Sequence, residues 1–204
     1  MDLKTHILTQ ADYLFSQYGI KRVTMDDIAK HLAMSKKTIY QHFADKNALI
    51  VDLMRNKMEN QACLVEKSAE NSKDAIQEVL MDVTRIQEML SKMNPVLFYD
   101  LQKYHPQAWL HFKSFKEQNL FKLIQKNLKR GISEGNYRKE INIEILTRMR
   151  IKQIDDTFNH TTYPINMFTM SKVMIEITEH FLYGICTLKG HKLINKYKQI
   201  IEEE

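Results

Sequence analysis

The residues with the clearest chemical potential lie between Thr24 and Lys46, in the segment TMDDIAKHLAMSKKTIYQHFADK. No carboxylate lies between Ile28 and Ala44. The positions that the apolar spacing leaves outward carry ammonium groups, hydroxyls, an amide and an imidazole: Lys36, Lys37, Thr38, Tyr40, Gln41 and His42. This cationic, donor-rich surface suits the DNA major groove, which admits one helix and presents mainly acceptors. The alternative is an ordinary helical hairpin whose lysines are only solvated.

Short-range signals predict the two helices that position this surface. Thr24 and Asp27 have the spacing of a capping box, which starts one helix. Ser35 is a good N-cap for a second helix, which Ile39 would anchor to the core. We expect phosphate contacts from Thr24 and Lys46, each at a helix N-terminus, because free N–H groups there bind anions. The predicted DNA-binding residues are therefore Thr24, Ser35, Lys36, Lys37, Thr38, Tyr40, His42 and Lys46.

This segment resembles the DNA-binding helix-turn-helix of the TetR (tetracycline-repressor-like) family. The positions that match the family's pattern are Thr24, Ile28, Ala29, Ser35, Thr38, Tyr40, His42, Phe43 and Lys46. Members usually have glycine in the turn where this chain has Ala33, and a smaller residue where it has Leu32. Alanine at a positive φ costs on the order of 1 kcal/mol, so a slightly different turn is expected. The resemblance implies an all-α fold.

The composition agrees with a helical chain and with a DNA-binding N-terminal part. The 204 residues include only 5 glycines and 3 prolines, which favours long helices over many short strands. The formal net charge is +5, and no glutamate precedes Glu59. We expect a helix-turn-helix DNA-binding domain of three helices at 1–46, followed by a larger helical effector-binding and dimerisation domain at 47–204.

The helix expected over roughly 166–188 has a strongly apolar face that would need a cover in a monomer. In the TetR-like arrangement, the last two long helices pair with their copies in a homodimer. The predicted dimer interface therefore consists of Met170, Val173, Met174, Ile177, Phe181 and Gly184.

A group of aromatic and amide side chains in the larger domain is a candidate ligand pocket: Phe98, Tyr99, Gln102, Trp109, Phe112 and Gln153. In the family, a cavity between the central helices takes a small effector. Aromatic residues at helical spacing are also common as plain core, and the two glutamines would equally suit water. Both interpretations stay open at this point.

Sequence patterns of enzymes and metalloproteins are absent. The chain has no glycine-rich phosphate loop, no SxxK or GxSxG site, and no HExxH pair. Cys63 and Cys186 lie far apart without a CxxC motif. We therefore predict no catalytic residue, no metal, no cofactor and no enzymatic activity. Without a signal peptide or an apolar run of about 18 residues, we expect a cytoplasmic protein with no membrane partner.

These observations together predict a homodimeric transcriptional regulator that binds double-stranded DNA at a roughly palindromic operator. It would act as a repressor, and a small-molecule effector would release it. The alternative is a helical small-molecule-binding or interaction protein without specific DNA binding. A sequence preference in DNA titrations over a salt series would separate the two.

Overall fold

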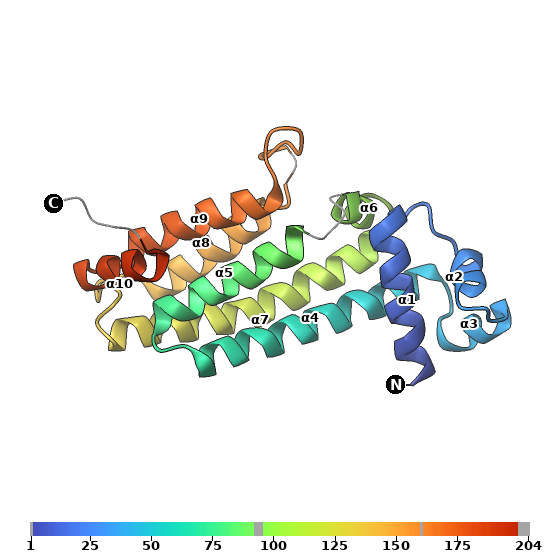
Figure 1. Cartoon of the computed structure of the whole chain (residues 1–204), viewed down its shortest axis with the longest axis horizontal. Helices are drawn as coiled ribbons and strands as arrows, with labels where there is room; N and C mark the ends of the chain where they lie inside the picture. The colour runs from blue at the N-terminus through green and yellow to red at the C-terminus, as the bar shows by residue number, and fades with distance from the viewer. Residues whose placement is uncertain (1, 92–95, 160, 200–204) are drawn as a thin grey trace. The chain divides into compact units, whose positions relative to one another are not determined.

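The computed structural model describes residues 2–91, 96–159 and 161–199, with only the backbone for residues 96, 115 and 116. Within these residues the fold is all-α, as predicted, and one isolated antiparallel bridge joins Tyr137 to Cys186. The ten helices of the described residues (Figure 1) are α1 (Leu3–Tyr18), α2 (Met25–His31), α3 (Lys36–His42), α4 (Lys46–Asn71), α5 (Ala75–Ser91), α6 (Val96–Tyr104), α7 (Pro106–Ser133), α8 (Ile143–Asp156), α9 (Met170–Ile185) and α10 (Leu188–Lys198).

The chain divides into two compact units. Unit 1 comprises Met1–Gln61 and Met93–Lys116, and unit 2 comprises Ala62–Lys92 and Glu117–Glu204. Helices α4 and α7 each contribute residues to both units. Helix α6 therefore belongs with the N-terminal helices, although the sequence interpretation placed it in the second domain. The predicted functional boundary after residue 46 stays a prediction.

Unit 1 is built on α1, α2 and α3, which share one apolar core. Apolar residues recur every three to four positions along α1, so a single face of this helix is buried. Helix α1 begins at the N-cap Asp2, whose carboxylate accepts the Thr5 N–H at 2.8 Å, and ends at Gly19, whose φ is +81°. The buried core residues of these helices include Ile7, Leu8, Ala11, Leu14, Phe15, Ile28, Ala29 and Ile39.

Unit 2 is a layer of long helices in which α5 packs along α9, with α10 against α5 and α8 beside α9 (Figure 1). Tyr137 is fully buried in the hydrophobic core of this unit, and its hydroxyl donates to the Asn127 side-chain oxygen at 3.0 Å. Gly131 permits this arrangement, because a Cβ there would lie 2.1 Å from the Tyr137 ring. The Asn127 amide donates in turn to the Ala75 carbonyl at 3.0 Å.

A network around Arg130 ties α4, α5 and α7 together within unit 2. The Arg130 guanidinium lies 2.9 Å from the Glu78 carboxylate and 2.7 Å from the Glu134 carboxylate. It also donates to the Ala69 carbonyl at 3.0 Å and to the Ser72 hydroxyl at 2.8 Å. Every one of these contacts is between complementary groups, so the charge of this partly buried arginine is compensated.

Candidate nucleic-acid interface

Helix α2 begins with the predicted capping box. The Thr24 hydroxyl oxygen accepts the Asp27 N–H at 3.1 Å, and the Asp27 carboxylate accepts the Thr24 N–H at 2.9 Å. The Thr24 hydroxyl also donates to that carboxylate at 2.6 Å. These hydrogen bonds from Thr24 lower the pKa of Asp27 below its ordinary value. The N-terminus of α2 is thereby held in one geometry.

The turn between α2 and α3 has Ala33 in the left-handed region, with φ +51°. The Ala33 N–H donates to the Lys30 carbonyl at 3.0 Å, and the Met34 N–H donates to the Ala29 carbonyl at 2.9 Å. These bonds satisfy carbonyls at the end of α2. Ala33 therefore adopts the positive φ that is unfavourable for alanine, and the hydrogen bonds of the turn hold it in place.

Helix α3 has one buried apolar side and one exposed polar side. Ser35 caps it by accepting the Thr38 N–H at 3.1 Å, and the hydroxyls of Ser35 and Thr38 lie 2.8 Å apart. Ile39 at its centre is fully buried, and Phe43 just after its end is 98% buried. The opposite face carries Lys36, Lys37, Tyr40 and Gln41 in exposed positions, with Thr38 and His42 half-buried. Tyr40 keeps 49% of its surface exposed. A rigid helix with this surface has the dimensions and donors for the major groove.

Two of the predicted DNA-binding lysines have partners within the chain. Lys36 forms an ion pair with Asp26 of α2, with both side chains largely exposed. Lys46 is half-buried. Its ammonium group donates a hydrogen bond to the Ile20 carbonyl at 2.5 Å and lies over the Phe15 ring. Burial lowers the pKa of Lys46. Lys46 therefore also stabilises the segment between α1 and α2, and its predicted phosphate contact stays a prediction.

Contacts between neighbouring helices hold α1 and α2 in register. The His31 imidazole lies 3.0 Å from the Gln10 side-chain oxygen and stacks on the Tyr13 ring with centroids 5.8 Å apart. On another side of α1, Lys4 pairs with Asp52 of α4 at 2.6 Å. Side-chain contacts therefore hold α1, α2 and α4 together, and these three helices support α3.

The family model described as "Bacterial regulatory proteins, tetR family" matches residues 7–53, which contain most of α1, all of α2 and the exposed face of α3. The chain belongs to the TetR family. It is thus a helix-turn-helix transcriptional regulator, in a family of DNA-binding proteins that are not enzymes, and the predictions of family, fold class and absent enzymatic activity are confirmed.

Similar proteins extend over most of the chain. It is 26% identical over 88% of its length to the uncharacterized HTH-type transcriptional regulator YvaF of Bacillus subtilis (strain 168), covering 93% of that protein. It is 23% identical over 71% of its length to the HTH-type transcriptional repressor KstR2 of Rhodococcus jostii (strain RHA1), covering 72% of it. The crystal structure of the regulator FadR from Bacillus subtilis in complex with stearoyl-CoA has a TM-score of 0.69 at 16% identity, with 89% and 98% coverage. That structural likeness concerns the fold.

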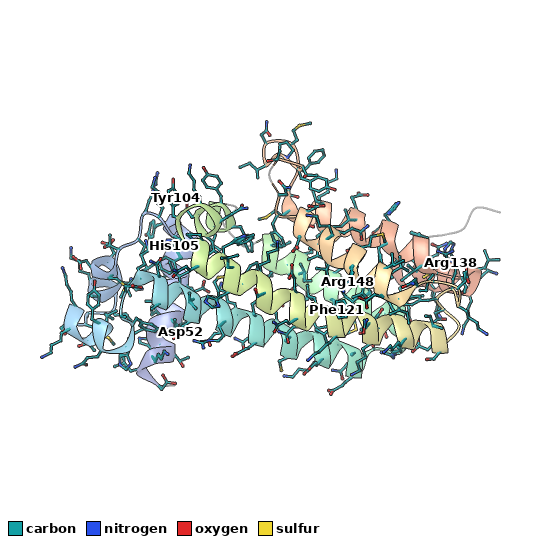
Figure 2. The ribbon with its side chains drawn as sticks, turned by 180° about the vertical axis from the view of Figure 1, so that it is seen from behind. Asp52, Tyr104, His105, Phe121, Arg138 and Arg148 are labelled. Atoms are coloured by element: carbon teal, nitrogen blue, oxygen red, sulfur yellow. The ribbon has the colours of Figure 1, made fainter. Side chains whose placement is uncertain are left out.

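One contact that anchors the helix-turn-helix head, the part of the chain formed by α1, α2 and α3, was missed by sequence reasoning. The buried Asp100 carboxylate of α6 accepts the Lys21 backbone N–H at 2.9 Å, in the segment that joins α1 to α2. The Lys21 ammonium donates to the Tyr104 hydroxyl at 3.1 Å, and this hydrogen bond lowers the pKa of Tyr104. Figure 2 labels Tyr104 and the adjacent His105, which lies 2.5 Å from the Asn47 side chain. Because 79 residues separate Lys21 from Asp100, no local pattern could have revealed the pair.

The predicted pocket residues divide between the two units. In unit 1, Phe98 and Phe112 are buried, with ring centroids 5.9 Å apart, and Trp109 stacks on Phe112 at 5.3 Å. Tyr99 and Gln102 of α6 are exposed, and the Tyr99 hydroxyl accepts from Lys103. Gln153 lies in unit 2, where its side-chain oxygen is buried. Their assignment to an effector pocket stays a prediction.

The predicted interface face of α9 lies largely inside the chain. Met170, Val173, Met174 and Phe181 are buried within unit 2, Ile177 is half-buried and Gly184 is exposed. The large apolar residues that α8 exposes are Ile145, with 61% of its surface accessible, and Met149, with 41%. Sequence reasoning missed these two, although their i, i+4 spacing was a usable signal.

The described residues contain neither a candidate membrane-spanning helix nor a candidate metal site. No helix in the described ranges combines the length and the apolar character that crossing a membrane requires. Across the same part of the chain, histidine, cysteine, aspartate and glutamate form no group of three or more that could hold a metal ion.

Proposed function

We propose that this TetR-family chain is a homodimeric repressor that binds a roughly palindromic operator and is released by a small-molecule effector. The observation that carries the proposal is the exposed cationic face of α3. The opposite side of this helix is held in place by the buried Ile39 and Phe43. Lys36, Lys37, Thr38, Tyr40 and His42 would read base edges, and Thr24, Ser35 and Lys46 would contact phosphates or fix the helix N-termini.

Two-fold symmetry would set the operator geometry. Each subunit would present one α3 to one half-site, with the two helices spaced about one helical turn, roughly 34 Å, or a multiple of that distance. An effector that favours another spacing would weaken DNA binding. Helix α4, which begins beside the head and continues into unit 2, is the proposed transmitting element. Coupling of this kind is typically 1–3 kcal/mol and reciprocal, so DNA should weaken effector binding equally.

The proposed dimer interface combines the exposed faces of α8 and α9. Ile145 and Met149 would bury apolar surface against the partner, and Gly184 would permit close helix approach, since among the described residues no atom outside its own stretch of helix lies within 4 Å of a Cβ built there. Gly184→Arg and Ile145→Glu should each give monomers with much weaker operator binding. Leu110→Glu on the exposed face of α7, also 61% accessible, is the matched control. Unchanged sedimentation of both interface variants would refute this interface.

An apolar effector is supported by two proteins of the same fold. One is FadR from Bacillus subtilis in complex with stearoyl-CoA, and the other is the ketosteroid transcriptional regulator KstR2 of Mycobacterium tuberculosis, at a TM-score of 0.56 and 20% identity. A stearoyl chain and a steroid nucleus are both large apolar groups.

The test of DNA recognition is selection of bound sequences from a random duplex library, followed by anisotropy titrations over a salt series. We expect a two-fold symmetric consensus and an affinity that falls steeply with salt. Lys37→Ala and Tyr40→Ala should lower affinity for the selected site by roughly 1–3 kcal/mol and relax specificity, whereas Lys129→Ala, at an exposed position of α7, should do neither. Equal binding of selected and random duplexes would refute the proposal.

A further inference from the structure

Arg150 of α8 lies in the interior of unit 2 with part of its guanidinium unsatisfied. Only 6% of its surface is exposed. Nη2 donates to the Thr178 hydroxyl oxygen of α9 at 2.5 Å, and the guanidinium lies 5.2 Å from the centroid of the Phe181 ring. Nη1 is buried and finds no hydrogen-bond partner among the described residues. A buried donor left in this state destabilises a fold.

The charge of Arg150 also lacks compensation. Thr178 donates its own hydrogen to the Met174 carbonyl at 2.6 Å, so it can only accept from the guanidinium. Burial lowers the pKa of Arg150 to about 10, and the group therefore remains protonated at neutral pH. Within the described ranges, no carboxylate forms an ion pair with it. An uncompensated buried cation is unfavourable unless an anion joins it.

Arg130 shows that the same unit can satisfy a partly buried arginine. Its guanidinium has carboxylates of Glu78 and Glu134 within 2.9 Å and a hydroxyl and a carbonyl besides. Burial acts to lower the pKa of Arg130, but the hydrogen bonds to Glu134 and Glu78 outweigh it and raise the pKa. The surroundings of Arg130 are those of a structural residue, and the surroundings of Arg150 are different.

The side chains around Arg150 indicate what would complete its contacts. Gln153, three residues further along α8 and so on the same side of that helix, has a buried side-chain oxygen that also finds no partner among the described residues. On α9, Met174, Thr178 and Phe181 follow at helical spacing and are all buried. Unsatisfied polar atoms beside apolar walls are typical of a site for a ligand with a polar end and an apolar body.

We propose that Arg150 is the anion-binding residue of the effector site, and that the effector is an organic acid whose carboxylate or phosphate accepts from Nη1 while its apolar body lies along α9. Gln153 supplies a second polar contact to the same end of the ligand. This inference rests on the proposed ligand-responsive function.

The experiment is calorimetric titration of the full-length dimer with three probes of equal chain length: palmitate, palmitoyl-CoA and methyl palmitate. The wild type should bind at least one of the two anions about 10- to 100-fold more tightly than the neutral ester, the range expected for charge-assisted hydrogen bonds. Tight palmitate binding would assign the anion as a carboxylate, and binding of palmitoyl-CoA alone would assign it as a phosphate. Arg150→Met should abolish the preference in either case.

Arg148→Met is the matched control on the same helix. Arg148 keeps 70% of its side chain exposed, pairs with Glu144 at 2.7 Å and lies over Phe121 of α7, as Figure 2 shows. This variant should keep the preference. Without ligand, Arg150→Met should unfold at the same or a higher urea concentration than wild type, because it removes an uncompensated charge. A structural arginine would instead lower that concentration. Should Arg150→Met fail to fold, Arg150→Lys, which keeps the charge but loses Nη1, should weaken the preference.

Three outcomes overturn the inference: equal binding of the acid and the ester, an unchanged preference in the arginine variants, or no binding of any probe. Operator binding is measured separately on the same preparations. Specific DNA binding together with any of these outcomes refutes the anion site alone, whereas loss of specific DNA binding in the wild type refutes the proposed function.

Discussion

The charged side chains of the helix-turn-helix head and those of unit 2 lie in contrasting surroundings. On α3, Lys36 and Lys37 are exposed, and the one ion pair described there, to Asp26, is itself in contact with solvent. In unit 2, Arg150 and Glu78 are buried, and Arg130 is partly buried, with 27% of its side chain exposed.

This difference separates two uses of charge. Exposed ion pairs contribute little to stability because water and salt screen them, so the lysines of the head are available for a polyanion. Buried charges change stability strongly according to whether they are paired. We therefore expect substitutions in the head to alter DNA affinity with little effect on folding, and substitutions in unit 2 to alter folding or ligand binding. The four predictions below test this contrast.

The largest effect should come from Arg130→Met. It leaves the buried Glu78 carboxylate without its counterion and removes the hydrogen bonds to Ala69 and Ser72. We expect a loss of about 3–5 kcal/mol in the free energy of unfolding, measured by urea denaturation at pH 7. Arg148→Met, which breaks an exposed pair, should change it by less than about 0.5 kcal/mol. Similar losses in both variants would contradict the contrast.

Asp82 of α5 should make stability depend on pH. Burial raises its pKa from 3.8 to about 6. A hydrogen bond with Ser68 and the Arg85 guanidinium, 2.9 Å from the carboxylate, act to lower the pKa but do not outweigh burial. The folded state thus holds this proton more tightly than the unfolded state. Stability is highest with Asp82 protonated and falls as the pH rises from about 4 to about 6, by up to about 3 kcal/mol.

Asp82→Asn should remove this part of the pH dependence. The difference in unfolding free energy between variant and wild type should move in favour of the variant by about 2–3 kcal/mol between pH 4 and pH 7. Urea titrations at several pH values measure it, and comparing the two proteins cancels the other titrating groups. If the unfolding free energies of the two proteins changed in parallel across this pH range, Asp82 would ionise in the folded state without a loss of stability.

Ala33→Gly tests the part of the head where backbone conformation, and not charge, sets stability. Glycine adopts the observed φ of +51° without the steric cost of a Cβ, so we expect a gain of about 0.5–1 kcal/mol. Ala48→Gly in α4 is the opposite control, with an expected loss of about 1 kcal/mol. DNA affinity should change little, and a destabilised Ala33→Gly variant would argue against the left-handed turn.

The smallest change in stability should come from Asp26→Asn, which releases Lys36 from its ion pair. We expect less than about 0.5 kcal/mol in unfolding free energy. Affinity for DNA should rise about two- to fivefold at low salt, with the gain disappearing at high salt. Anisotropy titrations at two salt concentrations measure this. An unchanged affinity would indicate that Lys36 does not approach the phosphates.

Most of the head could be predicted because its signals are local. The capping box of Thr24 and Asp27, the Ser35 cap and the buried Ile39 each depend on residues within one or two helical turns. The interior of unit 2 could not be predicted in this way. Apolar periodicity showed that α9 has a buried face but not whether its own chain or a partner covers it, and Met174 and Phe181 are in fact buried within the chain.

The sequence by itself determined the all-α fold, the helix-turn-helix with its exposed lysines and Tyr40, and the family. Caps, turns and helical periodicity are short-range properties, so the order of residues is enough to specify them. Only the tertiary structure decided that Asp100 holds the Lys21 backbone, that Arg130 is fully paired and that Arg150 is not. Such outcomes depend on which distant residues meet in space, and on how much water their packing leaves around a charge.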